Sequence, residues 1–202
     1  MTRPLILASA SPARLGLLRA AGFAPEVVVS GVDEPPYRKG EDPREYVRGL
    51  AEAKATAVAR GDLPEGALVV GCDSMLVLDG EVFGKPADAD EALERWQQMR
   101  GQVGVLMTGH AVIDATAGTL VADVGSTTVH FGTPSDGELE AYVATGEPLL
   151  VAGGFTLDGR SAPFIAGIEG DWANVVGLSL PMFRALLVQL DVSVQELWVA
   201  AS

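Results

Sequence analysis

Two short segments of the sequence carry polar side chains directly after an apolar run, and the first has the composition of an anion site. Ser9, Ser11 and Arg14 follow the apolar run Leu5–Ala8. Pro12 favours a helix that begins here with Ser11 as its N-cap. Two hydroxyls, free backbone N–H groups and the positive end of the helix dipole would then converge, which suits a phosphate. An ordinary capped helix with a surface arginine is the alternative that spacing alone leaves open.

The second segment places Asp73 after the apolar run Ala67–Val70. We predict that this run is a strand ending before Asp73, so that the carboxylate lies at the C-terminal edge of a sheet, where open α/β sheets bind their ligands. A carboxylate there suits Mg²⁺ or Mn²⁺ and can also orient a water molecule. The alternative is an aspartate that only caps the strand end. The adjacent Cys72 is interpreted as a small buried apolar residue.

Two charged residues outside these segments are further candidates. Lys85 lies between a glycine and a proline after a predicted hairpin, and such a lysine can present a point charge to a phosphate. Its surroundings do not match the Walker phosphate loop, G-x-x-x-x-G-K-[ST]. Gly80 is one residue too close to Gly84 to be the first glycine of that pattern, and Pro86 stands in place of Ser or Thr. Glu34, in a polar loop, is either a second carboxylate for a metal or a solvated loop charge. The two histidines lack the spacing of zinc ligands.

The elements that must position these residues follow from hydrophobic periodicity and from the positions of proline and glycine. Strands are expected at 5–8, 26–29, 67–70, 75–78, 81–83, 103–114 and 119–131, and helices at 12–21, 43–60, 88–100, 136–144 and from 181 onward. Asp79 and Gly80 predict a two-residue hairpin. Strands and helices alternate at first and antiparallel pairs follow, so we expect an α/β fold with a mixed central sheet flanked by helices. No repeat or linker divides the chain, and residues 1–202 are expected to form a single domain.

The composition argues against several classes of protein. With 202 residues, 48% hydrophobic and 20% charged, the chain is typical of one globular domain and not of a disordered protein. A net charge of −13 argues against coating nucleic acid or an anionic membrane. The charge is uneven, because residues 1–60 hold nine basic and seven acidic side chains. A single cysteine allows no intrachain disulfide, and no export signal or membrane span is recognised, so a cytoplasmic location is expected.

Taken together and in order, these segments resemble the Maf family of nucleotide pyrophosphatases. No single tetrapeptide is decisive, but the ordered set spans nearly the whole chain. The matching stretches are Leu7–Arg14 (LASASPAR), Val32–Glu34, Leu50–Ala55 (LAEAKA), Gly71–Ser74 (GCDS), Asp79–Pro86 (DGEVFGKP), Thr108–Gly109, Glu147–Leu149, Ala152–Phe155, Ile168–Gly170 and Val176–Leu178.

The resemblance implies a single α/β domain similar to the inosine-triphosphate pyrophosphatases, usually a homodimer, with a nucleoside triphosphate as small-molecule substrate. The implied reaction is hydrolysis of the α–β phosphoanhydride to a nucleoside monophosphate and diphosphate with a divalent metal, Mg²⁺ or Mn²⁺. The resemblance assigns proton acceptance to Asp73, metal binding to Glu34 and Asp73, and a catalytic charge near the phosphates to Lys85. The residues that it places around the substrate are Ser9, Ser11, Arg14, Lys54 and Ser74, the last in place of a frequent threonine.

Several other positions depart from the family's pattern. Ala13 stands where many relatives have a second arginine, and Gly104 where many have a histidine. Val151 and Asp158 stand where the branch for thymidine and uridine triphosphates has Lys and Gln, and their segment is more similar to the branch associated with 7-methylguanosine triphosphate. The preferred base, ordinary or modified, is therefore open. Two alternatives are a nucleotide-sensing, septum-related binding protein without turnover and a phosphatase that removes the terminal phosphate.

Overall fold

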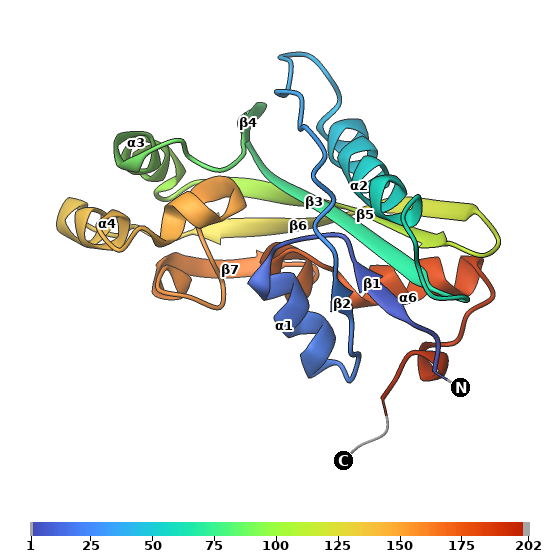
Figure 1. Ribbon diagram of the computed structural model, residues 1–202. Coiled ribbons are helices and arrows are strands. Elements are labelled where there is room, and N and C mark those ends of the chain that lie inside the picture. Colours follow the sequence, from blue (N-terminus) through green and yellow to red (C-terminus); the bar gives the residue numbers. More distant parts are fainter. Residues whose placement is uncertain (1, 200–202) are drawn as a thin grey trace. The chain divides into compact units, whose positions relative to one another are not determined.

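The computed structural model describes residues 2–199, in which seven strands form one mixed sheet (Figure 1). The strands are β1 (Leu5–Leu7), β2 (Glu26–Val27), β3 (Leu68–Leu78), β4 (Glu81–Phe83), β5 (Val103–Asp114), β6 (Thr119–Phe131) and β7 (Ile165–Glu169). The helices are α1 (Pro12–Ala20), α2 (Pro43–Ala59), α3 (Ala89–Met99), α4 (Asp136–Val143), α5 (Trp172–Val176) and α6 (Leu180–Gln189), with 3₁₀ turns at Glu147–Leu150, Ala152–Gly154, Ala162–Phe164 and Val194–Glu196. The sheet order is β2-β1-β3-β5-β6-β7 with β4 paired to β3, and the expected α/β fold with a mixed sheet is confirmed.

The described chain divides into two compact units. The first unit comprises residues 2–73, 108–125 and 177–199, and the second comprises residues 74–107 and 126–176. Strands β3, β5 and β6 each contribute residues to both units. Within residues 2–199, no helix is both long enough and apolar enough to cross a membrane.

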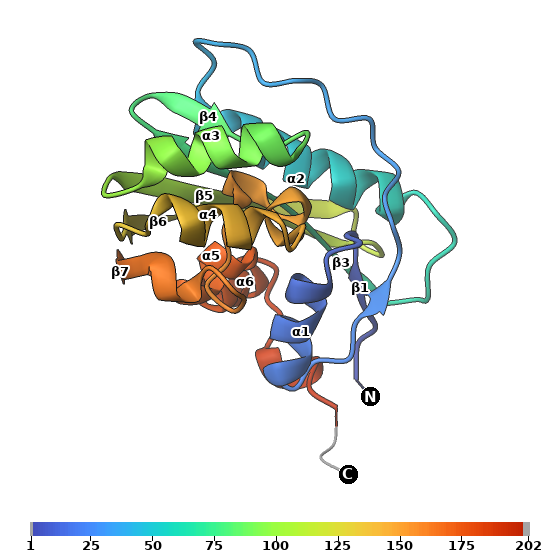
Figure 2. The same ribbon diagram turned by 90° about the vertical axis from the view of Figure 1, so that its left-hand side faces the viewer.

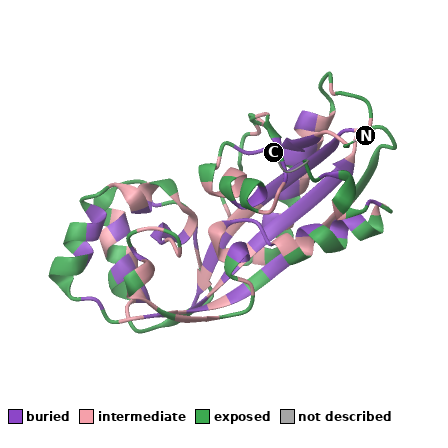
Figure 3. Cartoon of the chain, turned by 90° about the horizontal axis from the view of Figure 1, so that it is seen from below, coloured by how far each residue is buried: buried purple, intermediate pink, exposed green. Residues whose placement is uncertain are grey.

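The first unit is built around β1, which pairs in parallel with β2 on one side and β3 on the other. Leu5–Leu7 is almost completely buried, as expected for an apolar strand with a neighbour on each edge. In α2, Ala51 and Ala55 are fully buried in the same apolar cluster as Ile6 and Val69. Figure 3 shows buried residues concentrated along the strands, with exposed residues on the outer sides of the helices. The small side chains of α2 therefore face the sheet.

Helix α2 approaches the sheet closely because glycines lie beneath it. It begins at Pro43, as the sequence predicts, and Asp42 is its N-cap. A Cβ on Gly109 in β5 would lie only 2.2 Å from the carbonyl oxygen of Val47 in α2, and Gly71 in β3 is under the same constraint. No larger residue fits at either position without displacing the helix. The two glycines therefore set the height of α2 above the strands.

Strand β3 is longer than the sequence predicts. Its expected end at Val70 is wrong, because the strand continues through Asp73 and Ser74 to Leu78. The first part of β3 pairs in parallel with β1, and the last part pairs antiparallel with β4. Asp73 therefore lies within a strand and not beyond the strand's carboxyl end. The apolar run that marks the strand in the sequence stops at Gly71, where the lack of a side chain admits the backbone of α2.

The second unit has an aromatic core under α3 and α4. The hairpin between β3 and β4 is confirmed: Asp79 and Gly80 have φ values of 49° and 78°, as this tight turn requires. Trp96 in α3 is fully buried, and its ring meets those of Phe131 and Tyr142 edge to face. Helices α3 and α4 lie side by side, which Figure 2 shows clearly. Both helices therefore cover the same core.

Two elements of the second unit, β7 and α5, are absent from the sequence-based expectation. Strand β7 pairs antiparallel with β6, and its burial does not alternate cleanly, so no periodic apolar pattern marks it. Helix α5 has only five residues, which is too short for a helical period to be recognised. In the first unit, β2 has two residues and is shorter than the predicted strand at 26–29.

The two histidines occupy different settings. In the first unit, Nε2 of the buried His110 accepts the backbone N–H of Ser179, the N-cap of α6, at 2.8 Å. In the second unit, Nε2 of the partly exposed His130 lies 2.8 Å from Oε1 of Glu169. The first contact requires an unprotonated Nε2, whereas the second is strengthened when the ring is charged. Both contacts are structural, and neither histidine belongs to a zinc-ligand cluster within residues 2–199.

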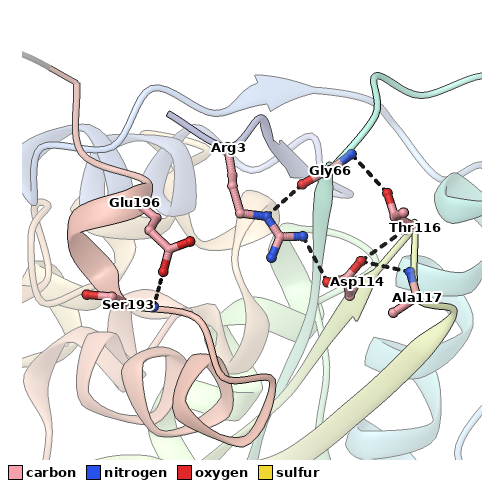
Figure 4. Close-up of polar contacts among 7 residues, drawn as sticks. All are labelled: Arg3, Gly66, Asp114, Thr116, Ala117, Ser193 and Glu196. Carbon is pink, nitrogen blue, oxygen red and sulfur yellow. Dashed lines mark hydrogen bonds and ion pairs between the residues drawn. The ribbon is translucent and has the colours of Figure 1, made fainter. Parts of the chain in front are cut away.

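Arg3 ties separate parts of the first unit together (Figure 4). Its Nε donates to the carbonyl oxygen of Gly66 at 2.8 Å, and its Nη2 donates to Oδ2 of Asp114 at 2.9 Å. The other carboxylate oxygen of Asp114 accepts the backbone N–H groups of Thr116 and Ala117, both at 3.0 Å. The backbone N–H of Arg3 donates to the C-terminal 3₁₀ turn at 2.8 Å. The contacts of Arg3 therefore connect the segment before β1 with the β5–β6 turn and with the C-terminal 3₁₀ turn.

Candidate active site

Ser9, Ser11 and Arg14 are brought together at the start of α1. Ser11 is the N-cap, as predicted, and its Oγ accepts the backbone N–H of Arg14 at 3.4 Å. The Oγ of Ser9 accepts the backbone N–H of Ser11 at 3.2 Å and Nη1 of Arg14 at 3.1 Å. The Nε of Arg14 donates to the carbonyl oxygen of Gly177 at 2.7 Å. The guanidinium is therefore held beside the hydroxyl of Ser9 at a helix N-terminus, where negative charge is stabilised.

Lys54 in α2 joins the two carboxylates that the sequence singled out. Its Nζ lies 2.7 Å from Oδ1 of Asp73 in β3 and 2.6 Å from Oε1 of Glu34 in the loop before α2. The side chains of Lys54 and Asp73 are mostly buried, with 11% and 13% exposed, whereas that of Glu34 is 53% exposed. A buried ammonium is tolerated when opposite charges surround it, and here two acids do so.

Burial has the largest effect on the protonation of Asp73. Removal from water raises the pKa of its carboxyl, while the charge and hydrogen bond of Lys54 oppose the rise and the charge of Arg14 opposes it more weakly. Arg14 and Lys54 therefore act on one carboxylate, which links the group at α1 to the group at α2. Burial also raises the pKa of the neighbouring Cys72 thiol to about 11, so this thiol stays protonated and inert near neutral pH.

Tyr46 is a candidate that the sequence motifs did not single out. Its hydroxyl donates to the carbonyl oxygen of Pro35, the residue after Glu34, at 2.5 Å. Burial raises the pKa of the phenol, and the negative charges of Asp73 and Glu34 raise it further. The hydroxyl therefore stays protonated and remains a donor. The sequence holds one indication of this role: Tyr46 precedes Lys54 by eight residues, about two turns of the same helix.

Ser74 and Lys85 belong to the second unit, so the predicted set is divided between the two units. Ser74 lies partly buried in β3, and Lys85 is exposed in the loop after β4. The backbone before Lys85 is fixed, because the carbonyl oxygen of Gly84 accepts Nη1 of Arg95 at 2.7 Å and the backbone N–H of Gly153 at 3.0 Å. Lys85 therefore presents its charge from an ordered loop.

The two carboxylates beside Lys54 have the chemistry of part of a divalent-metal site. Within residues 2–199, no group of three or more His, Cys, Asp or Glu side chains is arranged to hold a metal ion. Mg²⁺, however, is commonly held by one or two carboxylates and completed by waters and substrate phosphates. Glu34 and Asp73 each direct an oxygen at one positive centre, the ammonium of Lys54. Two hard oxygen donors that meet at one cation have the chemistry that Mg²⁺ or Mn²⁺ requires.

Three positions of the second unit depart from the family pattern: Gly104, Val151 and Asp158. A Cβ on Gly104 would lie 2.9 Å from Cδ1 of Leu76, so a larger residue at this position requires the side chain of Leu76 to shift. Positions 151 and 158 lie in a segment that Glu147 closes, because its Oε1 accepts Oγ1 of Thr156 at 2.7 Å and the backbone N–H of Arg160 at 2.9 Å. These contacts use neither of the side chains at those two positions.

Comparison with known proteins identifies the family of this chain. A model of the Maf-like protein family matches residues 4–190. A nucleoside triphosphate pyrophosphatase of Streptomyces coelicolor is 60% identical over 199 residues, which cover 98% of this chain and 96% of the relative. Relatives of the same name from Streptomyces avermitilis and Salinispora tropica are 57% and 52% identical, covering 97% and 96% of this chain and 95% and 87% of their own. The chain therefore belongs to the Maf-like protein family.

Proposed function

We propose that this chain is a nucleoside triphosphate pyrophosphatase, which hydrolyses the α–β phosphoanhydride to release a nucleoside monophosphate and diphosphate. Membership of the Maf-like family and the shared name of its relatives support this activity. The structural observation that carries the proposal is Lys54, which joins Asp73 and Glu34 while the charge of Arg14 acts on the same aspartate. The acids that would bind a metal and activate a water, Glu34 and Asp73, thus interact with cations that would bind phosphates, Lys54 and Arg14.

Asp73 acts as the general base in this proposal. Water adds across the phosphoanhydride as the α–β bridge breaks, and Asp73 accepts the proton that the water loses. Burial makes this carboxylate a stronger proton acceptor than an exposed one, because it raises the pKa of Asp73. Lys54 holds the carboxylate in place through their 2.7 Å contact.

The remaining residues bind and neutralise the phosphates. Ser9, Ser11 and Arg14 contact phosphate oxygens at the start of α1, where their hydroxyls and guanidinium already converge. Lys54 and Lys85 add point charges, and Ser74 adds a hydroxyl to the substrate-binding set. Displacement at phosphorus depends mainly on positioning and charge neutralisation, so a set of this kind is sufficient.

Glu34 and Asp73 would hold the divalent metal, Mg²⁺ or Mn²⁺. When bound, the metal supplies charge neutralisation at the phosphates and polarises a phosphoryl oxygen. The protein's own part is to keep two carboxylates at one point, which Lys54 does through its contacts of 2.6 and 2.7 Å.

We also propose a domain organisation, an oligomeric state and a cellular location for the protein. Residues 1–202 act as one pyrophosphatase domain, which the family match over residues 4–190 supports. The protein forms a homodimer, as the family resemblance implies, and light scattering on the purified chain tests this. It acts in the cytoplasm, where a single protonated thiol at Cys72 stays reduced.

Product analysis tests the proposed reaction. The wild-type protein is incubated with Mg²⁺ or Mn²⁺ and a panel of pyrimidine, purine and 7-methylguanosine triphosphates, and the products are separated. Monophosphate with diphosphate supports the proposal, and the best substrate in the panel identifies the base. A nucleoside diphosphate with orthophosphate would indicate a terminal phosphatase. Tight binding without products would indicate a nucleotide sensor.

A further inference from the structure

The segment that carries Glu34 has no regular secondary structure of its own. Residues 28–42 connect β2 to α2 without a helix or strand, and Glu34 is an exposed residue within them. Its carboxylate nevertheless lies 2.6 Å from Nζ of the buried Lys54. An ion pair with one solvent-exposed partner is worth about 1 kcal/mol or less, which is too little to order a loop by itself. Something else must hold this segment against the helix.

The hydroxyl of Tyr46 provides that second attachment. It donates to the carbonyl oxygen of Pro35 at 2.5 Å, one residue beyond Glu34. The ring of Tyr46 also packs edge to face on that of Tyr37, at 5.4 Å between centroids. Tyr37 in turn donates its hydroxyl to the carbonyl oxygen of Glu41 at 2.6 Å, which closes the far end of the segment. The segment is therefore fixed by two tyrosine hydroxyls, and that of Tyr46 acts nearest to Glu34.

Tyr46 and Lys54 belong to one rigid element. They lie eight residues apart in α2, which corresponds to about 12 Å along the helix axis. The hydroxyl of Tyr46 reaches the backbone beside Glu34, and the negative charges of Glu34 and Asp73 both raise the pKa of its phenol. One helix thus holds Glu34 from two points: directly through the ammonium, and indirectly through the backbone of Pro35.

We infer that Tyr46 is a positioning residue for the metal: by holding the carbonyl of Pro35 it sets Glu34 beside Asp73 and so completes the pair of carboxylates. This inference rests on the proposed function for its metal. The hydroxyl donates its hydrogen bond to the carbonyl oxygen of Pro35 and not to a carboxylate. Its effect is therefore exerted entirely through the position of Glu34.

A double-mutant cycle tests the inference by direct Mn²⁺ binding to the nucleotide-free protein, measured by electron paramagnetic resonance. We expect Tyr46→Phe to weaken Mn²⁺ binding by about three- to tenfold, the value of one hydrogen bond. We expect Glu34→Gln to weaken it at least as much. Because Tyr46 acts through Glu34, adding Tyr46→Phe to Glu34→Gln should change the affinity by less than about twofold.

Tyr37→Phe is the matched control, since it removes a hydroxyl from the same segment without touching Pro35. It should leave Mn²⁺ affinity within about twofold of the wild type. Equal losses from Tyr46→Phe with and without Glu34 would overturn the inference, as would a Tyr46→Phe variant that binds Mn²⁺ normally but has a raised KM for nucleotide. A wild-type protein that binds no Mn²⁺ would overturn it as well.

The Mn²⁺-binding experiment and the product assay can fail independently of each other. If the wild-type protein releases no diphosphate from any triphosphate, the proposed reaction fails, while the Mn²⁺ cycle still decides the role of Tyr46. If diphosphate is released but the cycle shows independent effects, the reaction stands and the inference fails.

Discussion

A Cβ on Gly71 would lie 2.2 Å from the carbonyl oxygen of Ala51, so the backbone of α2 occupies the space where a side chain of β3 would otherwise stand. Gly71 precedes Asp73 by two residues, and Ala51 precedes Lys54 by three. The contact therefore fixes the separation of the two elements close to the point where Lys54 meets Asp73 at 2.7 Å. Backbone packing, and not the ion pair alone, sets the geometry of the site.

Gly71→Ala should therefore damage both fold and site. A methyl group here overpacks the contact, which typically costs about 1–3 kcal/mol, and it pushes α2 away from β3. Chemical denaturation and diphosphate release measure the two effects. Gly49→Ala is the control, since Gly49 lies in α2 with open space around its Cβ position. It should leave stability unchanged or raise it by about 1 kcal/mol. Equal behaviour of the two variants would contradict the close approach.

Asp73→Asn should reduce turnover at least about a hundredfold, because the amide cannot accept the proton of the attacking water. Diphosphate release at saturating nucleotide is the measurement, with circular dichroism to show that the variant is folded. Asp62→Asn, in an exposed loop, should turn over normally. Near-normal release by Asp73→Asn would remove this residue from the mechanism.

The pH profile of kcat/KM should report the buried carboxylate. Asp73 must be ionised to act as a base, so activity is lost as the pH falls through its pKa, which burial raises above the ordinary value and Lys54 lowers in part. Lys54→Met removes the opposing charge. We expect the acidic limb of its profile to move to higher pH than that of the wild type, in addition to any loss in maximal rate. A limb that stays in place or moves to lower pH would show that Lys54 does not control Asp73.

Acid stability should depend on Asp114. Burial raises the pKa of this carboxyl, but the amide of Ala117, the guanidinium of Arg3 and the amide of Thr116 outweigh it and leave the pKa lowered. A group with a lowered pKa stabilises the fold above its unfolded pKa, about 4 for aspartate, and this stability is lost as the pH falls through the folded pKa. Asp114→Asn should be less stable at neutral pH and lose less on acidification below about pH 4. Thermal unfolding from pH 7 to pH 2 checks this. Parallel curves for the two proteins would refute it.

Metal removal should abolish turnover without unfolding the protein. After dialysis against a chelator, Lys54 still neutralises Glu34 and Asp73 through contacts of 2.6 and 2.7 Å. We expect the Tm to change by less than about 2 °C, which corresponds to less than about 1 kcal/mol for a chain of this size. Calorimetry before and after dialysis measures it, and added Mg²⁺ should restore the activity. A large fall in Tm would show that the metal is structural.

Features set by neighbouring residues could be predicted from the sequence. Ser11 followed by proline correctly marks the start of α1, and Asp79-Gly80 correctly marks the hairpin. The helix expected at 136–144 is present as α4, and Ser135 with Glu138 forms a capping box at its start. Each signal is local, because a side chain bonds to the backbone a few residues away or a turn demands a particular φ.

Features set by distant residues could not be predicted in the same way. The continuation of β3 through Asp73 depends on β1 and β4 as successive partners and on the fit of Gly71 against Ala51. The orientation of Arg14 depends on a carbonyl 163 residues away, that of Gly177. Pattern and spacing supply no signal for such contacts, and the family resemblance named residues without giving the contacts that hold them.

The chain has two histidines, and each compact unit holds one of them. His110 is buried with its Nε2 accepting a backbone N–H, which fixes the neutral tautomer that carries its proton on Nδ1. His130 is partly exposed, and its Nε2 lies beside Glu169. Selective ¹⁵N labelling of histidine would therefore give two imidazole spectra with distinct chemical shifts, one for each unit. The protein thus contains a built-in pair of NMR reporters, which can show whether its two units unfold together or in succession.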